Sequence, residues 1–284
     1  MKPKNYFLCA ILTMATMFTL NAQVYFQPPP VGAIPGAIDV SPTGAATYSI
    51  PIEVVPGTQG MQPNLSIVYN SMGGMGLLGM KWNLAGLSAI TRCGRNIYSD
   101  NNETSSIKFN DTDRFVLDGN RLISLEGIYG ADGTIYATEM EDFSRIVSAG
   151  DEIQTLIPFP LPPHYITTYV TTHFTAYTDD GNVIEYGHTT DSKQKLGTTD
   201  NSVLSWYVNK ITDANGNYMT FTYGNSNNEI WIQSIEYTGN GTMQPYAKVE
   251  FSYTTLPNTI LWERILILWV DTEYRKPNYW KPLP

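Results

Sequence analysis

The sequence predicts an all-β protein, an antiparallel sheet built from successive hairpins. Three observations carry this prediction. The 284 residues include 23 Gly, 18 Pro and 19 Tyr, which favour turns and strands over helices. Apolar and polar residues alternate over short segments with a period of two, which is typical of a half-buried strand. Asp-Gly and Asn-Gly pairs, which tolerate the positive φ of tight hairpin turns, separate several of these segments.

The first strand is predicted close to the start of the β region. Its apolar side chains occupy every second position, at Tyr48, Ile50, Ile52 and Val54. Pro51 lies between them and cannot donate a backbone hydrogen bond, so it predicts that this strand lies at a sheet edge. The alternation resumes over residues 65–69, after a turn.

Four hairpins are predicted further along the chain. They join Phe115–Leu117 to Leu122–Ile123, Phe174–Tyr177 to Val183–Tyr186, Leu204–Ile211 to Tyr218–Tyr223, and Ile230–Tyr237 to Ala247–Tyr253. Residues 158–163 are expected to be an irregular Pro-rich crossing. The last strand, Ala247–Tyr253, is expected to be an exposed edge, because the hairpin that would pair with it is missing from the sequence.

The N-terminus has the features of an export signal. Lys2 and Lys4 precede an apolar stretch without charge, and Ala22 is a small residue suited to cleavage. Residues 1–22 are therefore predicted to be a signal peptide, and the mature protein is expected to be secreted or associated with the cell envelope. Residues 23–42 are rich in Pro and Gly, which predicts a leader of polyproline II type.

The β region is expected to span residues 43–255, and an atypical tail follows it over 256–284. An apolar block at 265–270 is too short to span a membrane. Three of the six Trp fall in the last part of the chain, at Trp262, Trp269 and Trp280. We interpret the tail as the product of a truncation or a frameshift.

Charge and composition exclude several functional classes. Lys plus Arg is 17 against 26 for Asp plus Glu, a net charge of −9. Nucleic-acid binders usually carry a basic surface, so this class is disfavoured. The chain has 3 His and 2 Cys, which leaves little material for zinc sites or a disulfide framework. Removal of the signal peptide would leave Cys93 alone, so no internal disulfide is expected.

One segment fits the pattern G-x-G-x-x-G, from Gly74 to Gly79, and it follows a predicted strand. Asp100 follows at about the spacing of a ribose-binding acid. A dinucleotide site also needs a helix that begins at the last Gly, and Asn83 and Gly86 interrupt any helix there. The favoured interpretation is a Gly-rich bend in which two backbone segments approach closely.

Two other segments resemble calcium loops, at 179–182 and 213–217. Neither has a closing Glu at the right distance, so both are predicted to be hairpin turns. The three histidines, His164, His173 and His188, have no partner at metal-ligand spacing.

Reactive side chains are equally scarce. Cys93 lies between Arg92 and Arg95, which can lower a thiol pKa, but a buried and inert thiol is the favoured interpretation. Glu139 and Glu141 could serve a glycosidase, although neighbouring acids in an acidic protein are usually solvated. We therefore predict a protein that is not an enzyme and has no catalytic, cofactor or metal site.

A longer pattern goes beyond generic β-structure. Its parts are Pro56–Gly60, Pro63–Ser71, Trp82–Arg92, Asp113–Leu122 and Trp206–Tyr223. Together they resemble the N-terminal region of SpvB-type and Tc-toxin B-component proteins and the start of RHS/YD-repeat proteins, over about residues 32–255. The family often has Gly before its Trp, and this chain has Lys81 there.

The resemblance implies a non-enzymatic scaffold. Proteins of this family are much longer, and their YD repeats wind a β-sheet shell around a polypeptide cargo. The expected partners are thus the remainder of an RHS shell and its toxin cargo, with self-association through an exposed β edge as a further expectation. No segment resembles a toxin domain, so enzymatic activity does not transfer. The alternative is a secreted β-sandwich that binds carbohydrate, or acts as an adhesin, through Tyr and Trp faces.

Overall fold

The computed structural model describes residues 35–158, 163–197, 203–226, 228–255, 264–265 and 271–274. The predicted signal peptide, residues 23–34 of the leader and most of the tail lie outside these ranges. Residues 36–284 form one compact unit. All regular elements in the described ranges are strands, and all their pairings are antiparallel, so the predicted fold class is confirmed. Among the described residues, no helix is long and apolar enough to cross a membrane.

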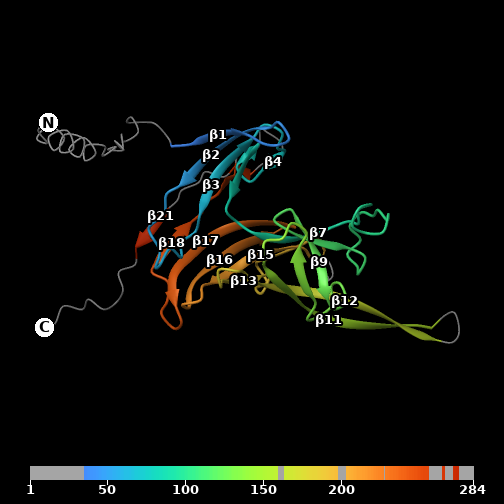
Figure 1. The fold of residues 1–284 in the computed structure, drawn as a ribbon. Coiled ribbons are helices and arrows are strands. Elements are labelled where there is room, and N and C mark those ends of the chain that lie inside the picture. The colour runs from blue at the N-terminus through green and yellow to red at the C-terminus, as the bar shows by residue number, and fades with distance from the viewer. Residues whose placement is uncertain are drawn as a thin grey trace, which may run out of the picture. The chain divides into compact units, whose positions relative to one another are not determined.

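The N-terminal strands form a four-stranded sheet of order β1-β2-β3-β6. Its strands are β1 (Ala37–Val40), β2 (Ala46–Ile52), β3 (Leu65–Asn70) and β6 (Trp82–Ala85), and they lie side by side in Figure 1. Strand β1 falls within residues 23–42, so the end of the expected leader is a strand rather than a polyproline II segment. This segment pairs antiparallel with β2, from Ala37 opposite Ser49 to Val40 opposite Ala46.

The prediction that Pro51 marks an edge strand is wrong, because β2 has β1 on one side and β3 on the other. The local environment explains how proline is tolerated. Strand β1 pairs only with residues 46–49, so Pro51 lies beyond its end and is paired with Ser66 of β3 alone. A missing N–H therefore costs no hydrogen bond to β1.

A second, larger sheet contains thirteen strands. It comprises β7 (Ala89–Cys93), β8 (Arg114–Leu117), β9 (Asn120–Glu126), β10 (Ile135–Thr138), β11 (Arg145–Ile157), β12 (His164–Tyr177), β13 (Val183–Tyr186), β14 (Lys193–Lys195), β15 (Val203–Thr212), β16 (Asn217–Ser226), β17 (Glu229–Asn240), β18 (Ala247–Glu250) and β21 (Asp271–Tyr274). Their order is β13-β12-β11-β10-β9-β8-β7-β15-β16-β17-β18-β21, and β14 pairs with β15. All four predicted hairpins are present.

The strands from β7 to β13 form a closed ring with β15. Strand β15 pairs with β7 at one end of this run and with β13 at the other. Inside the ring, Trp206 is fully buried and meets Phe115 and Phe174 edge-to-face, with ring centroids 5.5 and 5.1 Å apart. Tyr136 and Ile146 are also fully buried there. Closure gives every strand of the ring two neighbours over part of its length, which removes free edges.

The expectation that Ala247–Tyr253 forms an exposed edge is wrong. Strand β18 pairs with β17 on one side and with β21 on the other, from Ala247 opposite Tyr274 to Glu250 opposite Asp271. The pairing strand comes from the atypical tail, which sequence alternation alone did not connect to the sheet. In the tail, β20 (Arg264–Ile265) pairs with β19 (Thr254–Thr255), and residues 266–270 of the apolar block lie outside the described residues.

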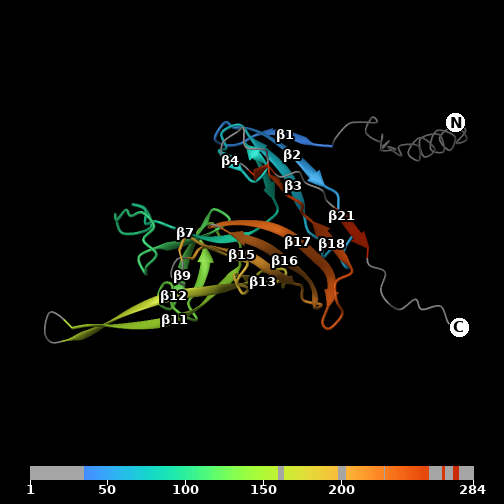
Figure 2. The same cartoon turned by 180° about the vertical axis from the view of Figure 1, so that it is seen from behind.

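Two further strand edges are exposed along the outer part of the long hairpin of β11 and β12. Residues 150–157 and 164–171 pair only with each other within the described chain, and we call this pair the ribbon. Figure 1 and Figure 2 show it extending away from the other strands. The sequence analysis predicted only the inner end of β12, at Phe174–Tyr177, and missed the rest of both strands. The Pro-rich crossing expected at 158–163 lies between them in the sequence. Residues 159–162 lie outside the described ranges.

Candidate functional site

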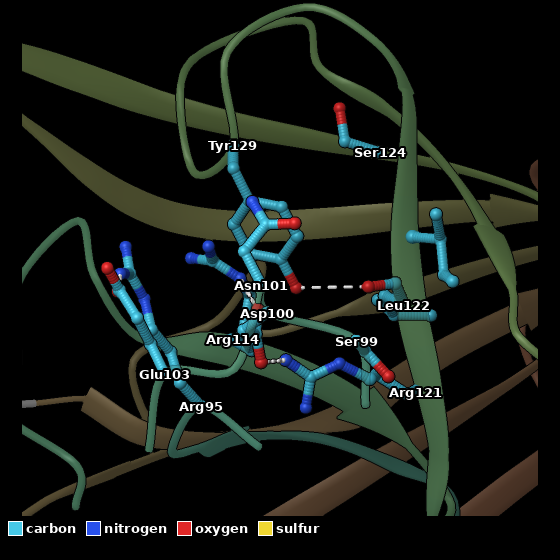
Figure 3. A pocket seen from close by; sticks show the side chains of 11 residues that line it. Arg95, Ser99, Asp100, Asn101, Glu103, Arg114, Arg121, Leu122, Ser124 and Tyr129 are labelled. Carbon is cyan, nitrogen blue, oxygen red and sulfur yellow. Dashed lines mark hydrogen bonds and ion pairs between the residues drawn. The ribbon is translucent and has the colours of Figure 1, made fainter. Parts of the chain in front are cut away.

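A polar pocket with a volume of about 260 Å³ lies beside the loop between β7 and β8. Its wall is built from that loop, from β8 and β9, and from Tyr129. The lining side chains carry three arginines and two acids: Arg95, Arg114, Arg121, Asp100 and Glu103. In Figure 3, Arg95 and Glu103 lie on one side of the Asp100–Arg114 pair, and Arg121 lies on the other.

Asp100 organises the loop and the pocket together. Its Oδ2 accepts a hydrogen bond from the backbone N–H of Asn96 at 2.8 Å, while its own N–H donates to the Asn96 carbonyl. Arg114 Nε donates to Asp100 Oδ1 at 2.8 Å, and Arg121 Nη2 binds Oδ2. The Asp100 side chain is only 3% exposed, so its charge depends on these partners.

The pKa of Asp100 reflects two opposing effects. Burial disfavours the charged carboxylate and by itself raises the pKa. The hydrogen bonds from Asn96 and Arg114, together with the charges of Arg121 and Arg114, outweigh burial and hold the pKa below its usual value. Asp100 is therefore an ionised structural anchor, and its carboxylate oxygens are already bound by two arginines and the Asn96 N–H.

Glu103 is held much more loosely. It pairs with Arg95 Nη1, and its side chain is 62% exposed. The two residues before it, Asn101 and Asn102, have φ of 53° and 63°, a left-handed turn that asparagine tolerates. Lys108 lines an adjoining hollow on the other side of Glu103, together with Arg95. The pocket thus has one buried carboxylate, Asp100, and one largely exposed carboxylate, Glu103.

Tyr129 lines the pocket on the side of Arg114 (Figure 3). Its hydroxyl donates to the Leu122 carbonyl at 3.2 Å and accepts the N–H of Phe115 at 2.7 Å. The guanidinium of Arg114 lies over its ring, 4.6 Å from the centroid. Burial raises the pKa of Tyr129, so the ring stays a neutral platform for the arginine.

A second buried ion pair lies beneath the pocket. Arg92 Nη1 is 3.6 Å from Asp113 Oδ2, and Arg92 Nε donates to the Val203 carbonyl at 2.8 Å. The guanidinium lies between the rings of Phe115 and Trp206, 5.4 and 5.2 Å from their centroids. Burial lowers the pKa of Arg92, against the opposing effect of Asp113. This pair joins the pocket loop to the aromatic core.

Cys93 is a free and half-buried thiol. Burial raises its pKa, and the charge of Arg121, whose Nη1 is 3.7 Å from the sulfur, does not reverse this. The predicted inert thiol therefore agrees with its surroundings, and the alternative of a lowered pKa is wrong because desolvation outweighs the neighbouring charge.

The Gly-rich motif from Gly74 to Gly79 forms a bend, the interpretation that the sequence favoured. Its residues form a two-stranded turn of β4 (Met75–Gly76) and β5 (Gly79–Met80), and no helix follows. A Cβ on Gly76 would lie 2.1 Å from the Trp82 carbonyl oxygen, so only glycine allows the backbones to approach this closely.

The calcium-like segments are hairpin turns. Asp213 Oδ1 accepts the backbone N–H groups of Asn215 and Asn217, both at 2.8 Å, and Asp180 bonds the side chain of Asn182. These oxygens serve the turn itself. Within the described ranges, no three His, Cys, Asp or Glu side chains are grouped as metal ligands.

The structure brings two of the three histidines together. The rings of His173, on β12, and His188, two residues past the end of β13, are 4.0 Å apart between centroids, and Glu185 lies beside them. His164 lies on the exposed ribbon. Glu139 accepts a hydrogen bond from Ser99 at the pocket rim, and Glu141 binds the N–H of Phe143, so these two acids serve separate local contacts.

Sequence reasoning missed the arginine pocket, although a signal for it was present. Arg114 and Arg121 both lie in the segment Asp113–Leu122 that carried the family resemblance. Their spacing places them on adjacent strands β8 and β9 across the Asp118-Gly119 turn. The partner acid comes from a loop whose position no local pattern reveals.

Comparison with known proteins places this fold. The chain matches the SpvB family, described as Salmonella virulence plasmid 65kDa B protein, over residues 40–249. None of the curated proteins matches it. Among solved structures, TcdB2-TccC3 is similar with 17% identity and a TM-score of 0.56, over 81% of this chain and 12% of that one.

Two further structures are similar. The Photorhabdus luminescens Tc holotoxin pore, with the mutation TccC3-D651A, has 15% identity and a TM-score of 0.57 over 85% of this chain. The N-terminal domain of the effector protein SpvB from Salmonella typhimurium strain LT2 has 16% identity and a TM-score of 0.49, over 72% of this chain and 73% of that one. The chain spans 12% of the length of the Tc toxin chains it matches. Since the family match covers most of its residues, the chain belongs to the SpvB family.

Proposed function

We propose that this protein is a non-enzymatic scaffold, one part of an exported shell that encloses or delivers a polypeptide toxin. Family membership and the similarity to the Tc toxin chains support a shell role. Export through residues 1–22 belongs to the same proposal. The expected partners are the remaining strands of an RHS-type shell and the cargo within it.

The observation that carries the proposal is the ribbon. Within the described residues neither of its outer edges has a neighbouring strand, so its backbone N–H and C=O groups are a template for further strands. Its exposed apolar side chains are Ile153, Leu156, Tyr165 and Ile166, between 48% and 66% exposed. No Asp, Glu, Lys or Arg occurs from Ile153 to Thr178, although the chain carries a net charge of −9.

These features suit a strand that is covered in the assembled protein. A charge-free strand accepts an apolar β-partner without burying an unpaired charge. A lipid bilayer is a poorer fit, because open strand edges leave backbone groups unsatisfied in hydrocarbon. We therefore assign the ribbon to pairing with strands of the rest of the shell.

The carbohydrate-binding alternative receives less support. It requires a continuous aromatic face on the surface, whereas large aromatic rings are buried in the core, at Trp206, Tyr136, Tyr186 and Tyr237. The exposed rings lie in separate segments of the chain, at Tyr98, Phe143, Tyr165 and Tyr177. The buried rings stabilise the sheet rather than present a sugar platform.

The test begins with the DNA downstream of this coding sequence. The polypeptide encoded there is co-expressed with this chain, and co-elution is measured by size-exclusion chromatography. The matched variant replaces residues 152–169 with a two-residue Asn-Gly turn, which keeps the Asp151–Val170 pair and leaves the strands of the closed ring in place. The proposal expects Tyr-Asp repeats in the downstream polypeptide and loss of co-elution in the variant. The absence of such repeats, or co-elution that is independent of the ribbon, would contradict it.

A further inference from the structure

We propose that the pocket bounded by Arg95, Arg114 and Arg121 binds a single oxyanion, a carboxylate or a phosphate group. This site is separate from the ribbon and does not depend on the shell role. The inference rests on unused hydrogen-bond donors, on the position of Glu103 and on the size of the pocket.

The arginines have more donors than the protein uses. Each guanidinium carries five N–H groups in a rigid fork. The three side chains make seven hydrogen bonds within the described chain. Arg95 Nη2, Arg114 Nη2 and Arg121 Nε have no partner among the described residues. Planar forks of this kind match the geometry of carboxylate and phosphate oxygens.

The charges around the pocket leave room for one more anion. Three arginines line it against Asp100 and Glu103, and Lys108 stands behind Glu103. Glu139 approaches only the rim, through the Ser99 hydroxyl at 3.3 Å. Asp100 is saturated by two arginines and the Asn96 N–H. The field inside the pocket is therefore positive in a protein whose total charge is negative.

Glu103 behaves as an internal competitor for the same donors. Its carboxylate is already an oxyanion bound to Arg95, yet it is 62% exposed and anchored by that one ion pair. Asp100, by contrast, is 3% exposed and held from three sides. An incoming oxyanion can displace Glu103 toward solvent while Asp100 keeps Arg114 and Arg121 in place.

The size of the pocket limits the ligand. Its volume of about 260 Å³ lies below the roughly 300 Å³ at which pockets for small organic molecules begin. A phosphate ion or the end of an acidic side chain fits, and a dinucleotide does not. The neighbouring Ile123, which is 41% exposed, can contact the methylene groups of such a side chain.

The experiment titrates the full chain with potassium phosphate at low ionic strength and neutral pH, with potassium chloride of equal ionic strength as the reference. Binding is followed by calorimetry and by amide shifts in NMR. Glu103→Gln removes the competing charge, so phosphate should bind about threefold to fivefold more tightly, as expected for one charge a few ångströms away in a wet site. Glu152→Gln makes the same change on the ribbon and should leave the affinity unchanged.

Arginine variants test the fork geometry. Arg114→Lys keeps the charge but loses the planar donors, and binding should weaken about tenfold. Arg145→Lys makes the same change outside the pocket and should have no effect. If Arg114→Lys fails to fold, Glu103→Gln still decides, because tighter binding cannot arise from a damaged fold.

A short peptide containing one Glu, compared with its Gln counterpart, separates the two sources of the oxyanion. Binding of the Glu peptide alone assigns the site to a polypeptide carboxylate, and binding of phosphate alone assigns it to free anions. The proposal is overturned if neither probe binds the wild-type chain, or if Glu103→Gln and Glu152→Gln bind phosphate equally.

Discussion

Strands β11 and β12 have an inner half and an outer half that share one continuous ladder but differ in burial. In the inner half, Ile146 and Phe174 are fully buried within the closed ring. In the outer half, Ile153 and Ile166 are each 48% exposed. The boundary is a register shift between Ala149 and Gly150.

Gly150 marks the point where the two halves separate. A Cβ there would lie 2.6 Å from the Val170 carbonyl oxygen, so the bulge needs glycine. The comparison teaches that strand pairing alone does not create a core. The β11–β12 ladder runs through both halves, but only the inner half also pairs with β10 and β13 and packs its side chains inside the ring.

The largest expected effect comes from a substitution in the core of the closed ring. Trp206→Ala should lower the free energy of unfolding by about 3–5 kcal/mol, because it empties the centre of the aromatic cluster. The variant also removes the indole N–H that bonds the Thr172 carbonyl at 3.0 Å. Urea unfolding followed by circular dichroism measures the loss. A loss below about 1 kcal/mol would mean that the ring core is not the source of stability.

The second effect concerns the loop that the ring carries. Asp100→Asn should cost about 2–3 kcal/mol, since it leaves Arg114 and Arg121 with a neutral partner in a buried position. The pKa of Asp100 is lowered in the folded protein, so its stabilising effect is present above its unfolded pKa. That effect is lost as pH falls through the folded pKa. As pH is lowered below the unfolded Asp pKa, the free energy of unfolding of the variant should therefore fall less steeply than that of the wild-type chain. An equal pH dependence in both proteins would contradict the assigned role.

The parts of the fold that the sequence predicts are those whose paired strands are close together in the chain. The Asp118-Gly119 and Asn215-Gly216 pairs fixed two hairpins, and both glycines have the positive φ that such turns require. The closure of the ring could not be predicted, because it pairs Ala89–Thr91 with Ser205–Tyr207, which are more than a hundred residues apart in the sequence. Periodicity is local and does not reveal which strands meet.

The ribbon and the pocket were missed for different reasons. Along β12, Thr is the main partner of the apolar residues, and it fits both the buried and the exposed face of a sheet, so the alternation is weak. For the pocket, Asp100 was considered only through its spacing from a glycine motif, whereas its partners lie on β8 and β9. The buried ion pairs became visible only once the strands were placed.

A smaller effect is the pH dependence of stability that arises from His173, at the boundary between the ring and the ribbon. The pKa of His173 is lowered by burial first and then by His188 and Lys193, so the folded state prefers the neutral ring. Stability should be full above the unfolded His pKa of about 6.5 and should fall as pH decreases toward the folded pKa. His173→Gln should remove this slope between pH 7 and pH 5. His164→Gln on the ribbon is the matched control, and an equal change in both variants would refute the assignment.

The smallest expected effect lies on the ribbon itself. Ile166→Ser should change the free energy of unfolding of the isolated chain by less than about 0.5 kcal/mol, because its side chain is already half in water. Ile146→Ser, at the inner end of the same hairpin, should cost several times more, since that side chain is fully buried. The same Ile166→Ser variant should weaken binding to the downstream shell polypeptide, because the exposed apolar residue would be buried only in the assembly. If Ile166→Ser instead destabilises the isolated chain as much as Ile146→Ser, the outer half already packs as a core, and its lack of charge needs no partner to explain it.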